Sequence, residues 1–256
     1  DLYYIANTYT GRERNDEQGR LSADCSFRVT DKVPELWDPV SGSVRSLPDY
    51  SQQKGRTVIP LEFEPRQAYF IRFQPRSVAK AQSKSVSANF PKVATTQELK
   101  GPWKVSFDPK WFYPDEGRNA KISFETLQDW STHKSTAVKY FSGTALYQRS
   151  FDLQDTTQLS NKLCLRLGKV YNMAEVHLNG HNLGVVWCAP WQLEIPRGVL
   201  KAKGNSLTLK VCNLWPNRLI GDEQRPEDCQ WKDAGGFEGE RLDKWPAWLM
   251  DNTPRT

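Results

Sequence analysis

Hydrophobic and polar residues alternate with a period of two through most of this 256-residue chain. This pattern constrains the fold more than any other feature, because a period of two puts every second side chain on one face of a β-strand. A helix needs a period near 3.6, and no such stretch runs beyond about two turns. The chain is therefore predicted to be all-β, and its 16 glycines and 16 prolines fit the many turns of such a fold.

Residues 1–75 predict a small antiparallel β-sandwich domain. Ile59, Leu61 and Phe63 share one face of a strand, which indicates that this face is buried. Residues 68–73 are apolar on both faces, as in a central strand. Further strands are predicted at residues 2–8, 23–29 and 35–37, with a turn at residues 38–42.

Residues 76–97 are small, polar and without a pattern, and they predict a linker or an extended crossover. Residues 98–256 predict a second domain, a jelly-roll β-sandwich of about eight short strands. Asn179-Gly180 predicts a hairpin turn, because both residues tolerate positive φ. Three of the strands have one apolar and one polar face, and they lie at residues 103–107, 163–167 and 207–211.

Composition excludes several classes of function. The net charge of +5 comes from 35 basic and 30 acidic residues that are interspersed, so no basic stripe predicts a nucleic-acid partner. No apolar run approaches the roughly 20 residues of a membrane span. The chain begins in strand-like sequence without Met or a signal peptide, which is typical of a piece of a longer protein or of a processed form.

The five cysteines lack metal-binding spacing, and their odd number leaves at least one thiol unpaired. We expect buried single thiols. Cys164 and Cys212 are expected on outward strand faces, and the sequence leaves open whether they pair.

Catalysis by this chain alone is not predicted. A glycosidase needs two carboxyl groups about 5–9.5 Å apart, and the one suggestive pair, Asp222-Glu223, is adjacent in a segment expected to be extended. Adjacent side chains there point apart, so this segment is interpreted as a loop held by Asn217 and Arg218. The three histidines lie in no nucleophile elbow, and phosphate-loop and HExxH motifs are missing. No cofactor is predicted, and calcium stays open because residues 108–117 and 222–233 are rich in oxygen ligands.

Tryptophan is the positive signal for binding, with ten residues in the chain. Trp residues near strand ends and loops can stack on sugar rings, whereas core packing is expected to take Trp103 and at least half of the others. The candidate carbohydrate-binding residues are Trp187, Trp191, Trp215, Asn217, Arg218, Asp222 and Glu223.

Several motifs, taken in order, resemble the C-terminal region of glycoside hydrolase family 106, the α-L-rhamnosidase-like enzymes. The strongest are ELWDP with Gly42, YFSGTA and NRLIGDE, which begin at Glu35, Tyr140 and Asn217, and the strand from Asp1 to Asn7 is also similar. The NG-x-x-LG and GN elements, which begin at Asn179 and Gly204, also occur in family 2 glycosidases. The resemblance covers nearly the whole chain and implies a galactose-binding-like jelly roll in its second part.

The resemblance implies that the catalytic acids lie in an upstream (β/α)₈ barrel, for which this β-patterned chain has no room. The chain is then expected to be an inactive accessory β region that supports the barrel of a bacterial glycoside hydrolase, in the periplasm or outside the cell. The implied carbohydrate is a rhamnose-containing plant polysaccharide. Two alternatives stay open: a stand-alone lectin-like surface protein, and a purely structural scaffold with an exposed apolar patch for the barrel.

Overall fold

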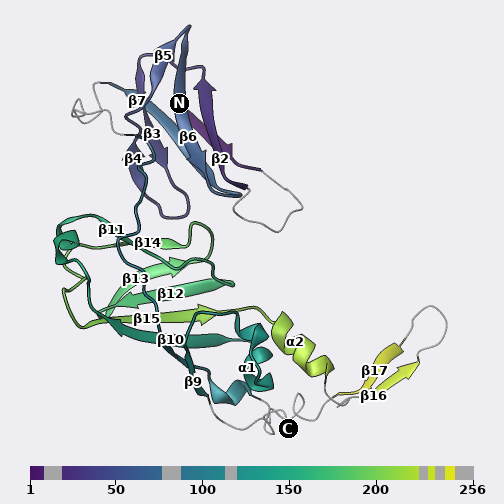
Figure 1. Ribbon diagram of the computed structural model, residues 1–256. Coiled ribbons are helices and arrows are strands. Elements are labelled where there is room, and N and C mark those ends of the chain that lie inside the picture. The colour runs from purple at the N-terminus through teal and green to yellow at the C-terminus, as the bar shows by residue number, and fades with distance from the viewer. Residues whose placement is uncertain (9–18, 77–87, 113–119, 225–229, 234–239, 246–256) are drawn as a thin grey trace. The chain divides into compact units, whose positions relative to one another are not determined.

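Two compact units, Asp1–Thr95 and Thr96–Thr256, make up the computed structural model of the chain (Figure 1). The structure describes residues 1–8, 19–76, 88–112, 120–224, 230–233 and 240–245. Most of the described elements are strands in antiparallel sheets, which confirms the all-β prediction. None of the helices within the described ranges is long and apolar enough to cross a membrane.

The first unit contains two antiparallel sheets that share one core. Their orders are β1-β7-β3-β4 and β2-β6-β5. The strands are β1 (Leu2–Ala6), β2 (Leu21–Phe27), β3 (Lys32–Trp37), β4 (Val44–Ser46), β5 (Ser51–Gln53), β6 (Arg56–Phe63) and β7 (Ala68–Pro75). The strand β7 is central in its sheet, and Ile59, Leu61 and Phe63 of β6 are buried, as alternation predicted. The short strands β4 and β5 were not predicted, because three residues are too few to show a period.

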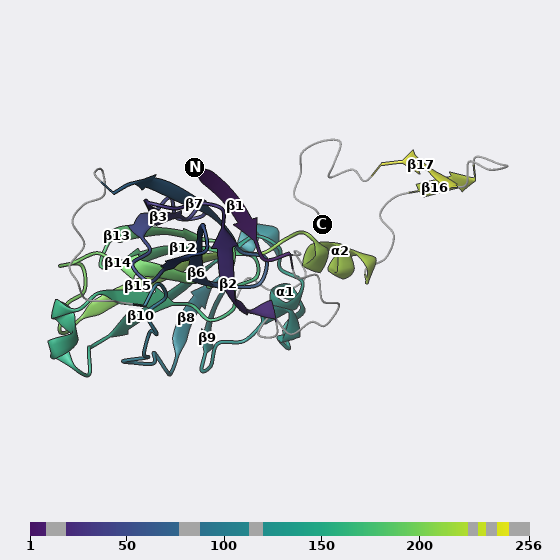
Figure 2. The ribbon, with the colours of Figure 1, turned by 90° about the horizontal axis from the view of Figure 1, so that it is seen from above.

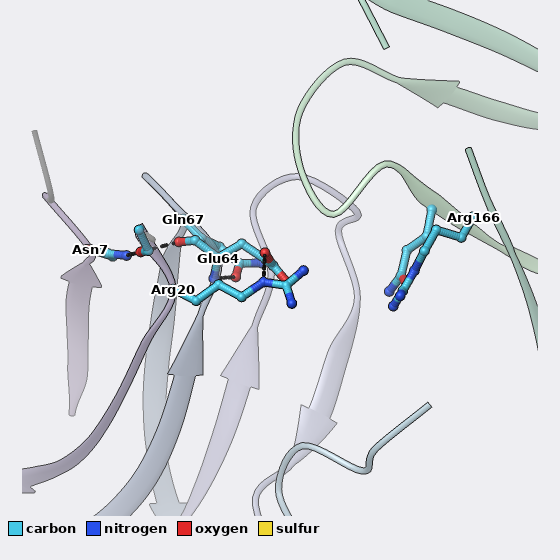
Figure 3. Close-up of polar contacts among 7 residues, drawn as sticks. Asn7, Arg20, Glu64, Gln67 and Arg166 are labelled. Atoms are coloured by element: carbon cyan, nitrogen blue, oxygen red, sulfur yellow. Dashed lines mark hydrogen bonds and ion pairs between the residues drawn. The ribbon is translucent and has the colours of Figure 1, made fainter. Parts of the chain in front are cut away.

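Asn7, which ends the first family-like motif, is a buried structural residue. Its side-chain Nδ2 donates hydrogen bonds to the carbonyl oxygens of Gly19, at 2.7 Å, and Glu64, at 3.1 Å. Its backbone N–H donates to the carbonyl of Gln67 at 2.9 Å, and the Glu64 carboxylate pairs with Arg20 at 2.8 Å (Figure 3). These bonds fix the end of β1 against the turn between β6 and β7.

Asn89 binds the end of the predicted linker to the first unit. Its buried side chain accepts a hydrogen bond from the backbone of Asp49 at 3.0 Å and donates to the carbonyls of Asp49 and Pro60 at 2.6 and 3.1 Å. Phe90 lies against Tyr69, with ring centroids 6.2 Å apart. Asn89 and Phe90, in the segment 76–97 predicted as a linker, therefore pack against the first unit. Residues 77–87 of that segment lie outside the described residues.

The second unit is built on a six-stranded antiparallel sheet with the order β13-β12-β15-β10-β8-β9 (Figure 1). A two-stranded sheet, β11-β14, packs on its core, and β16 pairs with β17. The strands are β8 (Trp103–Ser106), β9 (Lys121–Phe124), β10 (Thr144–Phe151), β11 (Leu163–Arg166), β12 (Met173–Leu178), β13 (His181–Val186), β14 (Gln192–Ile195), β15 (Asn205–Cys212), β16 (Gln230–Asp233) and β17 (Glu240–Lys244).

Short helices lie between these strands. They are the α-helices α1 (Thr136–Lys139) and α2 (Pro216–Glu223), and the 3₁₀ helices η2 (Pro109–Trp111), η4 (Trp130–Thr132) and η5 (Thr156–Ser160). Trp103, Val105 and Phe107 are buried on one face, as alternation predicted, and they belong to the main core of this unit.

The hairpin at Asn179-Gly180 is confirmed, because the two residues adopt φ angles of 52° and 82°. The Asn179 side chain donates to the carbonyl of Val199 at 2.7 Å and to Oδ1 of the fully buried Asn205 at 2.9 Å. The amide of Asn205 in turn donates to the carbonyl of Lys201 at 2.7 Å. The turn between β12 and β13 is thereby tied to the start of β15.

The expectation of buried cysteines is wrong. Cys25, Cys164 and Cys212 carry free thiols, so Cys164 and Cys212 do not pair. Cys164 is exposed, and Cys25, Cys188 and Cys212 are only partly buried. The reason is positional for Cys164, which lies on the outward face of β11, between the partly buried Leu163 and Leu165. Cys229 lies outside the described residues.

The buried hydroxyls of Tyr69 and Tyr147 are expected to make the folded protein less stable at alkaline pH. Burial raises the pKa of both hydroxyls, and the nearby carboxylates of Asp38 and Asp129, respectively, raise it further. Above about pH 10 the unfolded chain ionises these groups while the fold keeps them neutral. The free energy of unfolding should therefore fall by about 1.4 kcal/mol per pH unit for each tyrosine.

Guanidinium unfolding of the parent, Tyr69→Phe and Tyr147→Phe between about pH 9 and about pH 11 measures this loss. Each variant should show a shallower decline than the parent. Tyr4→Phe, at an exposed position, controls for the removal of a hydroxyl. Equal declines in the parent and both core variants would contradict the burial argument.

Candidate functional site

Ser142 and Asn213 join the start of β10 to the segment that follows β15. The Asn213 side chain accepts a hydrogen bond from the backbone of Gly143 at 2.9 Å and donates to the carbonyl of Phe141 at 2.9 Å. The Ser142 hydroxyl donates to the carbonyl of Leu214 at 3.0 Å. These contacts bring the motif YFSGTA together with the segment that leads into NRLIGDE, across 70 residues of sequence.

Residues 216–223 form the helix α2, so the expectation of an extended loop is wrong. Arg218 Nε donates to Asp222 at 3.0 Å, one helical turn later, and its Nη1 donates to the carbonyl of Trp111 at 2.8 Å. The backbone N–H of Arg218 also donates to Ser142 Oγ at 2.9 Å. A helix this short is marginal by itself and depends on such tertiary contacts, which the sequence does not display.

Gly221 allows α2 to lie directly against the end of α1. A Cβ atom at this position would come within 2.6 Å of Tyr140 Cβ, so a larger residue would force the helix away. Asn217 Nδ2 also donates to the carbonyl of Lys139, at 3.4 Å. Figures 1 and 2 both show α1 and α2 side by side.

The acidic pair of α2 does not form a two-carboxylate centre. Successive residues of a helix are rotated by about 100°, so Asp222 lies toward Arg218 while Glu223 is exposed. Among the described residues, no group of three or more His, Cys, Asp or Glu side chains could hold a metal ion. Parts of both loops considered for calcium, residues 113–119 and 225–229, lie outside the described residues.

Two of the three candidate tryptophans present their rings to solvent. Trp187 is 58% exposed and Trp215 is 66% exposed. Trp191 is only partly exposed and packs on a small cluster with Val170 and Val186. Its position therefore favours packing over an open platform.

The strand register places Trp187 and Trp215 beyond the same end of the six-stranded sheet, where β13 and β15 both stop. Ala174 of β12 lies opposite Val186 of β13 and also opposite Val211 of β15. Because β13 and β15 are both antiparallel to β12, their C-terminal ends leave the sheet together. Trp215 caps α2, the helix that carries Asn217, Arg218, Asp222 and Glu223, so these candidates belong to one segment that follows β15.

Two cavities flank the segment 213–217. The larger, about 580 Å³, lies over β10 and β15, and its lining includes Asp129, Trp130, Tyr147, Tyr171, Asn172 and Leu209. The smaller, about 400 Å³, includes Lys110, Trp111, Ser142, Thr144, Leu214 and Trp215 in its lining. Sequence reasoning missed the larger cavity, because its walls come from four separate segments.

Comparison with known proteins relates the chain to glycoside hydrolases, although no family model matches it. A protein named "Putative beta-glucuronidase" from Formosa agariphila is 41% identical over 158 residues, which are 61% of this chain and 13% of that protein. A solved rhamnosidase from Novosphingobium sp. PP1Y is 31% identical, with a TM-score of 0.71, over 88% of this chain and 20% of that one. The chain thus spans a small part of the length of either relative.

The contacts of Asn213 predict that Asn213→Ala lowers the free energy of unfolding by about 1–3 kcal/mol. The substitution leaves the N–H of Gly143 and the carbonyl of Phe141 without their partner. Trp187→Ala, at an exposed position, should change the same quantity by less than about 0.5 kcal/mol. Urea unfolding followed by tryptophan fluorescence measures both, and an Asn213→Ala effect as small as the control would contradict the role of this junction.

Proposed function

We propose that this chain is the non-catalytic accessory β region of an α-L-rhamnosidase-like glycoside hydrolase of family 106, with a galactose-binding-like second unit. The main support for this proposal is that 88% of the chain is similar in structure to a rhamnosidase. The matched part is 20% of that rhamnosidase. The motifs that resemble the family also meet in space, at the junction of residues 141–143 with 213–218. Motifs tied together by partly buried hydrogen bonds serve the architecture of the region.

The two carboxyl groups of α2, those of Asp222 and Glu223, do not form an acid–base pair, and this supports a non-catalytic role. Asp222 is engaged by Arg218, and Glu223 is exposed, so neither carboxyl lies in an apolar pocket. Hydrolysis then belongs to a catalytic barrel elsewhere in the longer protein.

An exposed apolar face on and before α2 supports docking to that barrel. Leu214, Leu219 and Ile220 are all more than half exposed, although α2 is fixed to the unit by its opposite face. Contiguous exposed apolar residues of this kind are typical of interaction surfaces. The occupant that we propose is the catalytic domain of the same polypeptide, since both relatives are far longer than this chain.

Carbohydrate contact is the second part of the proposal. The exposed rings of Trp187 and Trp215 suit stacking on pyranose faces, and Asn217, Arg218, Asp222 and Glu223 add hydrogen-bonding groups near Trp215. The proposed ligand is a rhamnose-containing plant polysaccharide, and the proposed location is the periplasm or the outside of a bacterial cell.

The isolated chain should not hydrolyse aryl α-L-rhamnosides or aryl β-D-glucuronides. Release of the aryl group is followed by absorbance, with a matched blank, and the rate should equal that of buffer. A rate above the blank that disappears in Asp222→Asn or Glu223→Gln would overturn the non-catalytic assignment. Buffer-level rates in the parent and both variants support it.

A further inference from the structure

The larger cavity of the second unit has a closed floor of buried aromatic and aliphatic residues. Tyr147 of β10 lies opposite Leu209 of β15, and both face the core, with Trp130 of η4 at the side. The rings of Trp130 and Tyr147 are stacked at 6.5 Å between centroids, with 24° between their planes. A volume of about 580 Å³ falls in the usual range of small-molecule sites, ~300–1,000 Å³.

The Tyr147 hydroxyl is a polar group within this otherwise apolar floor. The Tyr147 side chain is 95% buried, yet its hydroxyl makes no hydrogen bond to any residue that the structure describes. The hydroxyl oxygen is not one of the polar side-chain atoms that lack both a partner and accessible surface. It therefore remains accessible, and Tyr147 lines the cavity. A buried hydroxyl without a protein partner is satisfied by water or by a ligand.

Asp129 supplies a second polar group to the lining of the same cavity. Its Oδ1 accepts the backbone N–H of Ser131 at 2.9 Å and caps η4, and no hydrogen bond within the described residues occupies Oδ2. The carboxylate is close enough to raise the pKa of Tyr147, after the larger effect of burial. The two groups therefore offer a hydroxyl and a carboxylate oxygen to one small volume.

The rim of the cavity adds an aromatic face and an amide. Tyr171 is 55% exposed, the Lys169 ammonium lies 5.1 Å from the centroid of its ring, and Asn172 next to it is also exposed. Both lie in the connection between β11 and β12, opposite residues 127–131. An exposed aromatic ring above an apolar floor with a few polar groups matches the alternating C–H faces and hydroxyls of a sugar ring.

We propose that this cavity is a pyranose-binding site, in which Tyr147 and Asp129 bind sugar hydroxyls and Tyr171 covers one face of the ring. The proposal rests on the proposed function for its ligand class, and it assigns a site separate from the exposed Trp187 and Trp215. A purely apolar ligand would leave the Tyr147 hydroxyl and Asp129 Oδ2 without hydrogen bonds, at a cost that disfavours it.

The test titrates the full chain with L-rhamnose, D-galacturonate and rhamnose-containing pectic oligosaccharides by calorimetry. Tyr147→Phe removes one hydroxyl and keeps the ring, and the dissociation constant should rise about three- to tenfold. Tyr171→Ala, at an exposed position, should weaken binding by about tenfold without a change in thermal stability. The matched control is Tyr69→Phe, which removes the other strongly buried tyrosine hydroxyl, in the first unit.

Binding that weakens in Tyr147→Phe and Tyr171→Ala, and not in Tyr69→Phe, supports the site. Binding that is lost only in Trp187→Ala or Trp215→Ala overturns the site and leaves the proposed function standing. A flat titration with every sugar also overturns the site, whereas the accessory role is decided separately by the hydrolysis assay.

Discussion

The pairing of β10 with β15 is the interaction on which the second unit depends. Its ladder runs from Thr144 opposite Cys212 to Phe151 opposite Asn205, and both strands lie in the middle of the six-stranded sheet. Each end of this ladder is closed by an asparagine, the fully buried Asn205 at one end and the partly buried Asn213 at the other. Buried amides that satisfy backbone groups in this way specify one geometry, because any other arrangement would leave polar atoms without partners.

The functional surface follows from the Asn213 end. The junction with residues 141–143 directs the chain into α2, and α2 in turn places Arg218 on Asp222 and leaves Leu219 and Ile220 exposed. The same segment lines both cavities, so one short stretch contributes to the proposed docking face and to the proposed binding site.

The acidic residues show why chemistry cannot be assigned from residue types alone. Asp222-Glu223 was the most suggestive carboxylate pair in the sequence, but the structure engages one acid in an ion pair and leaves the other exposed. Asp129, which drew no attention in the sequence, instead lines the same cavity as the buried Tyr147. What distinguishes the two cases is the surroundings of each carboxylate, which depend on distant residues.

The sequence by itself determined the all-β class, the buried faces of β6, β8 and β15, the hairpin at Asn179-Gly180 and the outward position of Cys164. These features are local, since alternation and positive-φ tolerance act over a few residues. Only the tertiary structure decided the helix α2, the packing of Trp191 and the cavity around Tyr147. Each of these depends on contacts between segments far apart in the chain, such as Gly221 against Tyr140 and Tyr147 against Trp130. Local sequence patterns do not indicate which distant side chain will contact a buried group, so these contacts are known only from the packed tertiary structure.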